Sequence, residues 1–79
     1  MFKVKKLEKL VDFDFKENVN GYSKKVVGCN YDFLDIDLRG KVVKKVTFVQ
    51  NKFVYKNAEA KDIPDLIKNK IVKEIKSDS

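Results

Sequence analysis

Residues 41–57, KVVKKVTFVQNKFVYKN, decide how the rest of the chain is interpreted. The two halves of this stretch are rich in β-branched and aromatic residues, and a polar step separates them, which is typical of two β-strands joined by a tight turn. We expect Asn51 and Lys52 to form the turn, with Val49 opposite Val54. The stretch contains five lysines and no acidic residue. It therefore predicts a lysine-rich β-hairpin.

The preceding segments extend this hairpin into a meander. Asn20-Gly21 lies between alternating segments, where this dipeptide is a strong signal for a two-residue hairpin turn. Residues 39–41 mark a further turn. Between the two turns, residues 22–38 form one long strand-like run, in which we expect Gly28 to produce a kink or bulge. Alternation over residues 7–15 predicts a half-buried strand before the first turn.

Residues 58–79 have a different period. Isoleucines recur every fourth residue from Ile63 to Ile75, which gives one apolar side to a helix. Asp62 suits the N-cap, and Pro64 is tolerated in a first helical turn. We therefore predict a helix over residues 63–76, packed on the sheet, and a frayed tail at 77–79.

The predicted fold class is α+β. Seventy-nine residues are sufficient for one domain, so we assign residues 1–79 to a single unit. We expect a small, strongly bent antiparallel meander of four to five strands within residues 2–57, which could take the form of an SH3-like partial barrel, packed by one C-terminal helix. The predicted core contains Val11, Phe13, Phe15, Val26, Leu34, Ile36, Val46, Phe48, Ile63, Ile67 and Ile71.

This layout resembles the small archaeal chromatin proteins and chromo-like domains, which are curled sheets followed by a C-terminal helix. The matching residues are Lys61-Asp62-x-Pro64-x-x-Ile67 at the predicted helix start, preceded by the basic hairpin. They cover about a quarter of the chain. The acidic middle segment, the absence of tryptophan and the long strand-like run before the hairpin depart from that pattern, so we assign no family.

Composition limits the function classes. The chain is 43% hydrophobic, which is too apolar for a disordered protein. Its apolar runs are far shorter than the roughly 20 residues of a membrane helix, and no signal peptide is visible, so we expect no membrane partner and a cytoplasmic location, or a host cytoplasm if the protein is viral. With no histidine and no glycine-rich phosphate loop, we expect neither an enzyme nor a cofactor.

Two other features carry chemistry in principle. Cys29 lies in an apolar run, VVGC, and we expect it to be a small buried side chain. Asp12 and Asp14 share one predicted strand face, and Asp35 and Asp37 share another. Four such carboxylates could hold Mg²⁺ or Ca²⁺ if the strands were neighbours. We interpret them instead as the polar side of half-exposed strands, and we predict no metal site.

The net charge of +6 and its concentration in residues 41–57 favour a polyanionic partner. We predict a non-enzymatic binding module that binds the DNA or RNA backbone with little sequence preference. A single arginine in the chain is too few for much base-specific recognition. The predicted nucleic-acid-binding residues are Lys41, Lys44, Lys45, Lys52 and Lys56.

The alternative is a protein-binding regulator or inhibitor, of the kind that phages encode. Such a protein would act through an exposed sheet face or edge, and self-association along that edge is a related option. The predicted residues for this alternative are Tyr31, Phe33, Val49 and Val54.

Overall fold

The fold is taken from a computed structural model that describes residues 1–75. The last residue of the predicted helix, Lys76, and the tail predicted at 77–79 lie outside the described residues. The strands are β1 (Phe2–Val4), β2 (Lys16–Glu17), β3 (Gly21–Lys25), β4 (Phe33–Asp37), β5 (Val43–Val49), β6 (Lys52–Asn57) and β7 (Val72–Glu74). The helices are the 3₁₀ segments η1 (Leu7–Phe13) and η2 (Ala60–Asp62) and the α-helix α1 (Pro64–Lys68). None of these helices is long and apolar enough to cross a membrane.

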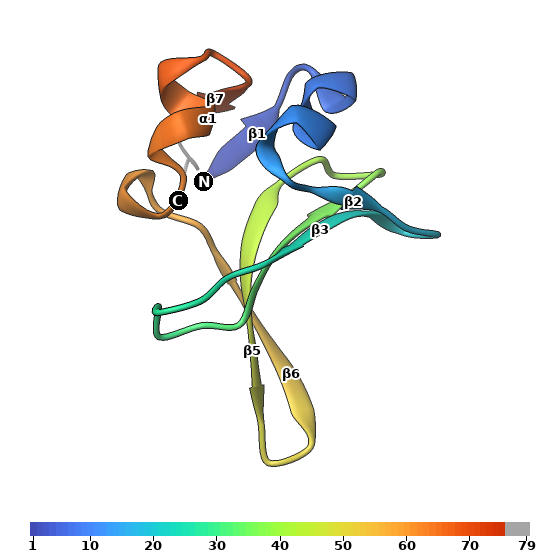
Figure 1. Cartoon of the computed structure of the whole chain (residues 1–79), viewed down its shortest axis with the longest axis vertical. Helices are drawn as coiled ribbons and strands as arrows, with labels where there is room; N and C mark the ends of the chain where they lie inside the picture. The colour runs from blue at the N-terminus through green and yellow to red at the C-terminus, as the bar shows by residue number, and fades with distance from the viewer. Residues whose placement is uncertain (76–79) are drawn as a thin grey trace.

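Strands β2 to β6 form one five-stranded antiparallel sheet in sequence order, which confirms the predicted meander (Figure 1). Strands β1 and β7 form a separate two-stranded sheet. Within residues 1–75, the large sheet does not close into a barrel, because its two end strands, β2 and β6, do not pair with each other. The α+β class is therefore confirmed in its coarser form, small antiparallel sheets with short helices, whereas an SH3-like barrel is not closed.

The predicted strand over residues 7–15 is wrong, because Leu7–Phe13 is a 3₁₀ helix. Leu7, Leu10 and Phe13 are three residues apart, which places them on one side of a 3₁₀ helix. Leu10 is fully buried there, whereas Val11, expected in the core, is 58% exposed. Asp14, at φ 69°, ends the helix in the left-handed conformation.

The first hairpin turn lies one residue earlier than predicted. Glu17 pairs with Tyr22, and Asn18 and Gly21 exchange backbone hydrogen bonds at 2.8 and 3.3 Å, so Val19 and Asn20 form the turn. The side-chain oxygen of Asn18 accepts the N–H groups of Asn20 and Gly21, both at 2.9 Å, and this local cap fixes the register.

The long run over residues 22–38 is two strands rather than one kinked strand. The chain reverses completely between β3 and β4, and Gly28 lies in the connecting loop at φ 82°. Cys29 is exposed in the same loop, so the expectation of a buried cysteine is also wrong. The next turn covers residues 38–40 and is closed by the Lys41 N–H, which donates to the Asp37 carbonyl at 2.7 Å. Beyond it, Asp35 lies opposite Lys44.

The predicted helix over 63–76 is much shorter, because α1 has only five residues. Lys70 takes a left-handed conformation at φ 58°, which a helix cannot continue through. The chain then turns into β7, where Val72 pairs with Val4 of β1. The regularly spaced isoleucines therefore lie in a short helix, a turn and a strand rather than in one long helix. Ile63 and Ile71 are nevertheless buried in the core.

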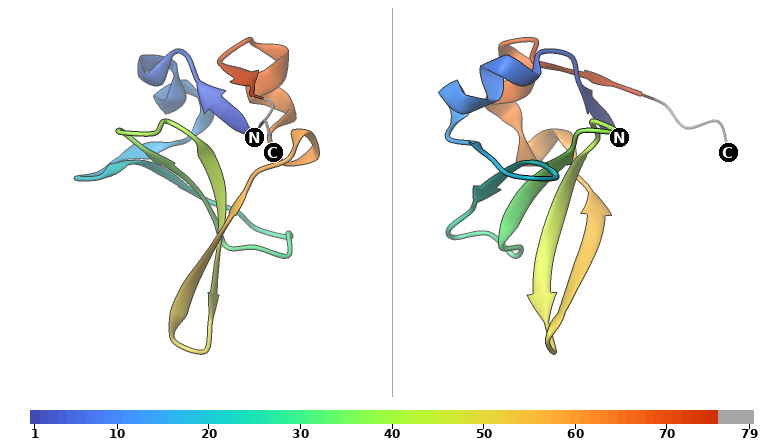
Figure 2. Two further views of the ribbon diagram at one scale, coloured as in Figure 1. Left: turned by 180° about the vertical axis from the view of Figure 1, so that it is seen from behind. Right: turned by 90° about the vertical axis from the view of Figure 1, so that its right-hand side faces the viewer.

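The core lies between one face of the large sheet and a second layer built from β1, β7, η1 and α1 (Figure 2). From the predicted core, Phe13, Val26 and Ile67 are only partly buried, and Phe48 is 50% exposed, so its assignment was wrong. Val46 is buried but does not belong to the main cluster. That cluster consists of Phe2, Val4, Leu10, Phe15, Tyr31, Leu34, Ile36, Val43, Ala58, Ile63, Leu66, Ile71 and Val72.

Candidate nucleic-acid interface

The β5–β6 hairpin projects away from the two-layered body of the molecule (Figures 1 and 2). Gln50 and Asn51 form its turn, with φ of 50° and 62°. Two consecutive positive φ values are those of a type I′ turn, whose twist matches that of paired strands. The turn is thus one residue earlier than predicted, and Val49 lies opposite Lys52.

One side of the hairpin carries three exposed aromatic side chains, Phe48, Phe53 and Tyr55, which we call the aromatic face. Phe48 lies directly opposite Phe53, and Tyr55 lies opposite Val46, so all point to the same side of the sheet. Their exposed fractions are 50%, 56% and 53%. The rings of Phe48 and Phe53 are 4.9 Å apart between centroids and tilted by 50°. The aromatic face therefore presents flat apolar surface to solvent.

The lysines of the hairpin do not form one patch. Lys44 is exposed on the same side as the aromatic face, opposite Asp35. Lys52 and Lys56 are exposed, but strand alternation places them on the opposite side. Lys41 is half-buried at the base of the hairpin, where its carbonyl oxygen accepts the Val4 N–H at 2.8 Å.

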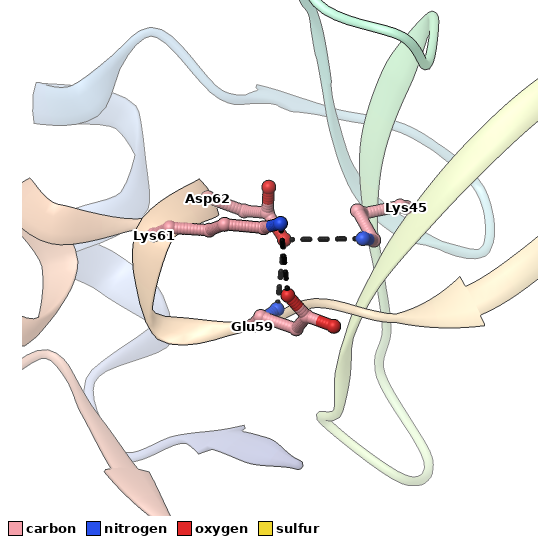
Figure 3. A network of polar contacts seen from close by, with 4 residues as sticks. All are labelled: Lys45, Glu59, Lys61 and Asp62. Carbon is pink, nitrogen blue, oxygen red and sulfur yellow. Dashed lines mark hydrogen bonds and ion pairs between the residues drawn. The ribbon is translucent and has the colours of Figure 1, made fainter.

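Lys45 is engaged within the protein. Its ammonium group lies 3.3 Å from Oδ2 of Asp62, with 18% and 8% of the two side chains exposed (Figure 3). The same carboxylate oxygen accepts the backbone N–H of Glu59 at 2.8 Å. The ammonium group also lies 5.7 Å from the centre of the Tyr31 ring. Lys45 therefore ties β5 to the segment that leads into α1, and is occupied there.

Tyr31 belongs to this same internal contact. It is only 7% exposed. Burial, together with the negative charge of Asp62, raises the pKa of Tyr31 to about 12. Among the residues predicted for protein binding, Tyr31 thus lies in the core and Phe33 is partly buried on the side of the aromatic face. Only Val49 and Val54 are exposed together, at 48% and 43%, on the side of the hairpin opposite the aromatic face.

Acidic groups border the base of the aromatic face. Burial raises the pKa of Asp35, and the charge of Asp37 adds to the effect, while the Ile36 backbone and Lys44 act against it. A surface hollow here is lined by these two carboxylates together with Lys44, Tyr55 and Arg39. The sequence had not indicated Arg39 as a candidate, because its proximity to Tyr55 depends on the register between β4, β5 and β6.

The other acidic pair does not join Asp35 and Asp37. Asp12 lies in η1 and Asp14 ends it, whereas Asp35 and Asp37 lie on β4. Within residues 1–75, no three histidine, cysteine or acidic side chains come close enough to hold a metal ion.

The nucleic-acid site predicted from the sequence consists of five lysines and includes no aromatic residue of the hairpin. The structure instead brings Phe48, Phe53 and Tyr55 together on one exposed side and divides the lysines. The sequence does contain a signal for this aromatic face. Phe53 and Tyr55 are two residues apart after a tight turn, and Phe48 precedes the turn, so strand alternation can place all three on one side.

Comparison with protein-family models found no match to this chain, and comparisons with curated proteins and with solved structures also found no significant match.

Proposed function

We propose that this protein is a non-enzymatic binding module that binds single-stranded nucleic acid with little sequence preference through the β5–β6 hairpin. The observation that carries the proposal is the aromatic face, three half-exposed rings on a projecting hairpin. Every nucleobase has a flat π-surface, so stacking on such rings tolerates any sequence and contributes about 1–3 kcal/mol per base. Bases in a duplex are already stacked, which is why a single strand fits this surface better.

Lysines around the aromatic face supply the contacts to phosphate. Lys44 lies on the same side as the rings, and Lys52 and Lys56 alternate with Phe53 and Tyr55 along β6. Lys52 and Lys56 lie on the other side of the thin hairpin, where their charges add to the positive potential that attracts a polyanion. Lys41 is the fourth candidate, whereas the ion pair with Asp62 removes Lys45 from the set.

Fluorescence anisotropy with labelled homopolymer single strands and a random duplex tests this proposal at two salt concentrations. Single strands release about 0.7 counterion per neutralised phosphate, so four lysines give a slope of log K against log salt of about −2 to −3. We expect tighter binding of single strands than of the duplex, and similar affinity for different homopolymers. Absence of binding at low salt with micromolar protein, or preference for the duplex, contradicts the proposal.

A protein partner is the second candidate, and one observation favours it. Val49 and Val54 are both exposed on the side of the hairpin opposite the aromatic face. Such a pair can anchor a regulator or inhibitor to its target. Affinity capture from a cell extract tests this candidate: a partner that is lost with Val49→Asp and retained with Phe48→Ala supports it, and a partner retained by both variants does not.

A further inference from the structure

Strand β6 forms one edge of the five-stranded sheet, and β5 is its only strand neighbour within residues 1–75. The Ala58 N–H donates to the Val43 carbonyl at 3.0 Å, so Ala58 points its backbone groups toward β5. Backbone groups alternate in direction along a strand of an antiparallel pair. The N–H and C=O groups of Phe53, Tyr55 and Asn57 therefore point away from the sheet, toward its open edge.

The opposite edge of the projecting hairpin is closed. Asp32 directly precedes β4, and its N–H donates to the Val46 carbonyl at 2.9 Å. The Asp32 carboxylate then accepts the Phe48 N–H at 2.8 Å. Asp32 thus bonds the Val46 carbonyl and the Phe48 N–H of β5, whereas β6 has no such cover among the described residues.

The open edge is also apolar on both of its sides. Phe53 and Tyr55 are 56% and 53% exposed on one side, and Val54 is 43% exposed on the other. Sheet edges of monomeric proteins are usually short, bulged or covered, because a regular apolar edge pairs with another strand. The two lysines of β6 oppose pairing wherever they would lie opposite each other, and they therefore restrict its register.

We propose that β6 pairs antiparallel with β6 of a second copy of this chain, with Tyr55 on the two-fold axis, so that two five-stranded sheets become one continuous sheet. This inference does not depend on the proposed nucleic-acid binding.

The lysines select this register. Two symmetric registers pair five residues of each strand. Centring on Val54 places Lys52 opposite Lys56 of the second copy, and like charges directly opposite each other are destabilising. Centring on Tyr55 instead places Lys56 opposite Val54.

The backbone favours the same register. Centred on Tyr55, all three outward-pointing residues form hydrogen-bonded pairs, because Phe53 meets Asn57 of the second copy and Tyr55 meets its own counterpart. Centring on Val54 uses only Phe53 and Tyr55. Opposite residues of paired strands share a side, so the two aromatic faces lie on the same side of the joined sheet.

Sedimentation equilibrium without nucleic acid tests the pairing. We expect the mass to rise with concentration from 9.2 kDa toward twice that value. Tyr55→Pro removes an outward N–H on the axis, once in each copy. It leaves the hairpin hydrogen bonds intact, because proline is tolerated where an edge N–H faces solvent. We expect this variant to raise the dimer dissociation constant about tenfold or more, because two intermolecular hydrogen bonds are lost.

A second variant tests the register and does not rely on proline. Val54→Glu places a carboxylate opposite Lys56 of the second copy, twice per dimer, and should lower the dissociation constant. Thr47→Glu is the matched control, because Thr47 lies opposite Val54 on β5, on the same side but away from the edge, and should change dimerisation little.

A monomer at every concentration up to about 1 mM overturns the proposal, since association weaker than this contributes only about 4 kcal/mol. A dimer unaffected by Tyr55→Pro overturns it too, because the contact then lies elsewhere. Weaker dimerisation by Val54→Glu overturns the register.

Discussion

Replacing Lys45 with methionine should destabilise the protein strongly, although Lys45 lies in the segment that looks like a solvated basic surface. The substitution keeps the length of the side chain and removes its charge. The Asp62 side chain, only 8% exposed, then loses its cationic partner at 3.3 Å and still accepts the Glu59 N–H. Breaking a buried ion pair on one side costs about 3–5 kcal/mol. Because 18% of the Lys45 side chain remains exposed, we expect about 2–3 kcal/mol.

That loss is a large part of the total stability. A domain of 79 residues has a free energy of unfolding of about 4–12 kcal/mol. Urea unfolding followed by circular dichroism measures the change for Lys45→Met, for Asp62→Asn and for the double variant. We expect the two substitutions to be strongly coupled, because Lys45→Met leaves the Asp62 charge unpaired and Asp62→Asn removes that charge.

Lys44→Met is the matched control, since Lys44 is exposed on the same strand and should change stability by about 0.5 kcal/mol at most. A loss below about 1 kcal/mol for Lys45→Met, or equal losses for the two lysines, would refute the structural role of the Lys45 ion pair. Reduced nucleic-acid binding by a Lys45 variant would then be read as a loss of contact with the ligand rather than a loss of fold.

Three further predictions concern pH and backbone packing. Burial raises the pKa of Tyr31 to about 12. The buried neutral hydroxyl therefore adds stability below about pH 10, and this stability is lost as pH rises toward 12. In an absorbance titration, Tyr31→Phe should remove the tyrosine ionisation near pH 12. Burial also raises the pKa of Asp35, so the folded state binds its proton more tightly than the unfolded state, and stability falls as pH rises through the folded pKa. Asp35→Asn should therefore raise the melting temperature at pH 7, and a lower value would contradict this. Gly21→Ala places a Cβ against the carbonyl oxygen of Ile36 and should cost about 3 kcal/mol in urea unfolding, whereas Gly40→Ala, with its nearest contact at 4.0 Å, should cost far less.

The meander could be predicted because its signals are local. Turn residues separate alternating runs, and short connections between such runs join neighbouring antiparallel strands. The registers could not be predicted as well, because side-chain caps and left-handed residues decide them. Asn18 caps the first turn, and Gln50 with Asn51 forms the last one.

The predictions for residues 7–15 and 63–76 gave the wrong secondary structure for a related reason. In η1, the apolar residues fit both the three-residue spacing of a 3₁₀ helix and the alternation of a strand. The chain forms the 3₁₀ helix, which buries Leu10. In residues 63–75, isoleucines four apart fit a long helix, but Lys70 turns the chain so that Val72 can pair with Val4 of β1. That pairing connects opposite ends of the sequence, and no local pattern reports it.

The exposed hairpin could be predicted from the sequence, but the arrangement of its side chains could not. Residues 41–57 do form an exposed hairpin, as expected. Its lysines were counted as one patch because net charge does not record which side of a strand each residue occupies. Alternation along the strands separates Lys44 from Lys52, and a partner distant in sequence, Asp62, engages Lys45.

The affinity of a single-stranded homopolymer for Phe53→Ala and Val54→Ala tests the central claim most directly. The two residues are neighbours on β6, and both are exposed, at 56% and 43%, but they point to opposite sides of the hairpin. Binding through the aromatic face predicts that Phe53→Ala weakens the complex by about 1–3 kcal/mol, roughly 5- to 150-fold, while Val54→Ala stays within about twofold. Equal losses for the two variants, or a larger loss for Val54→Ala, would contradict the account.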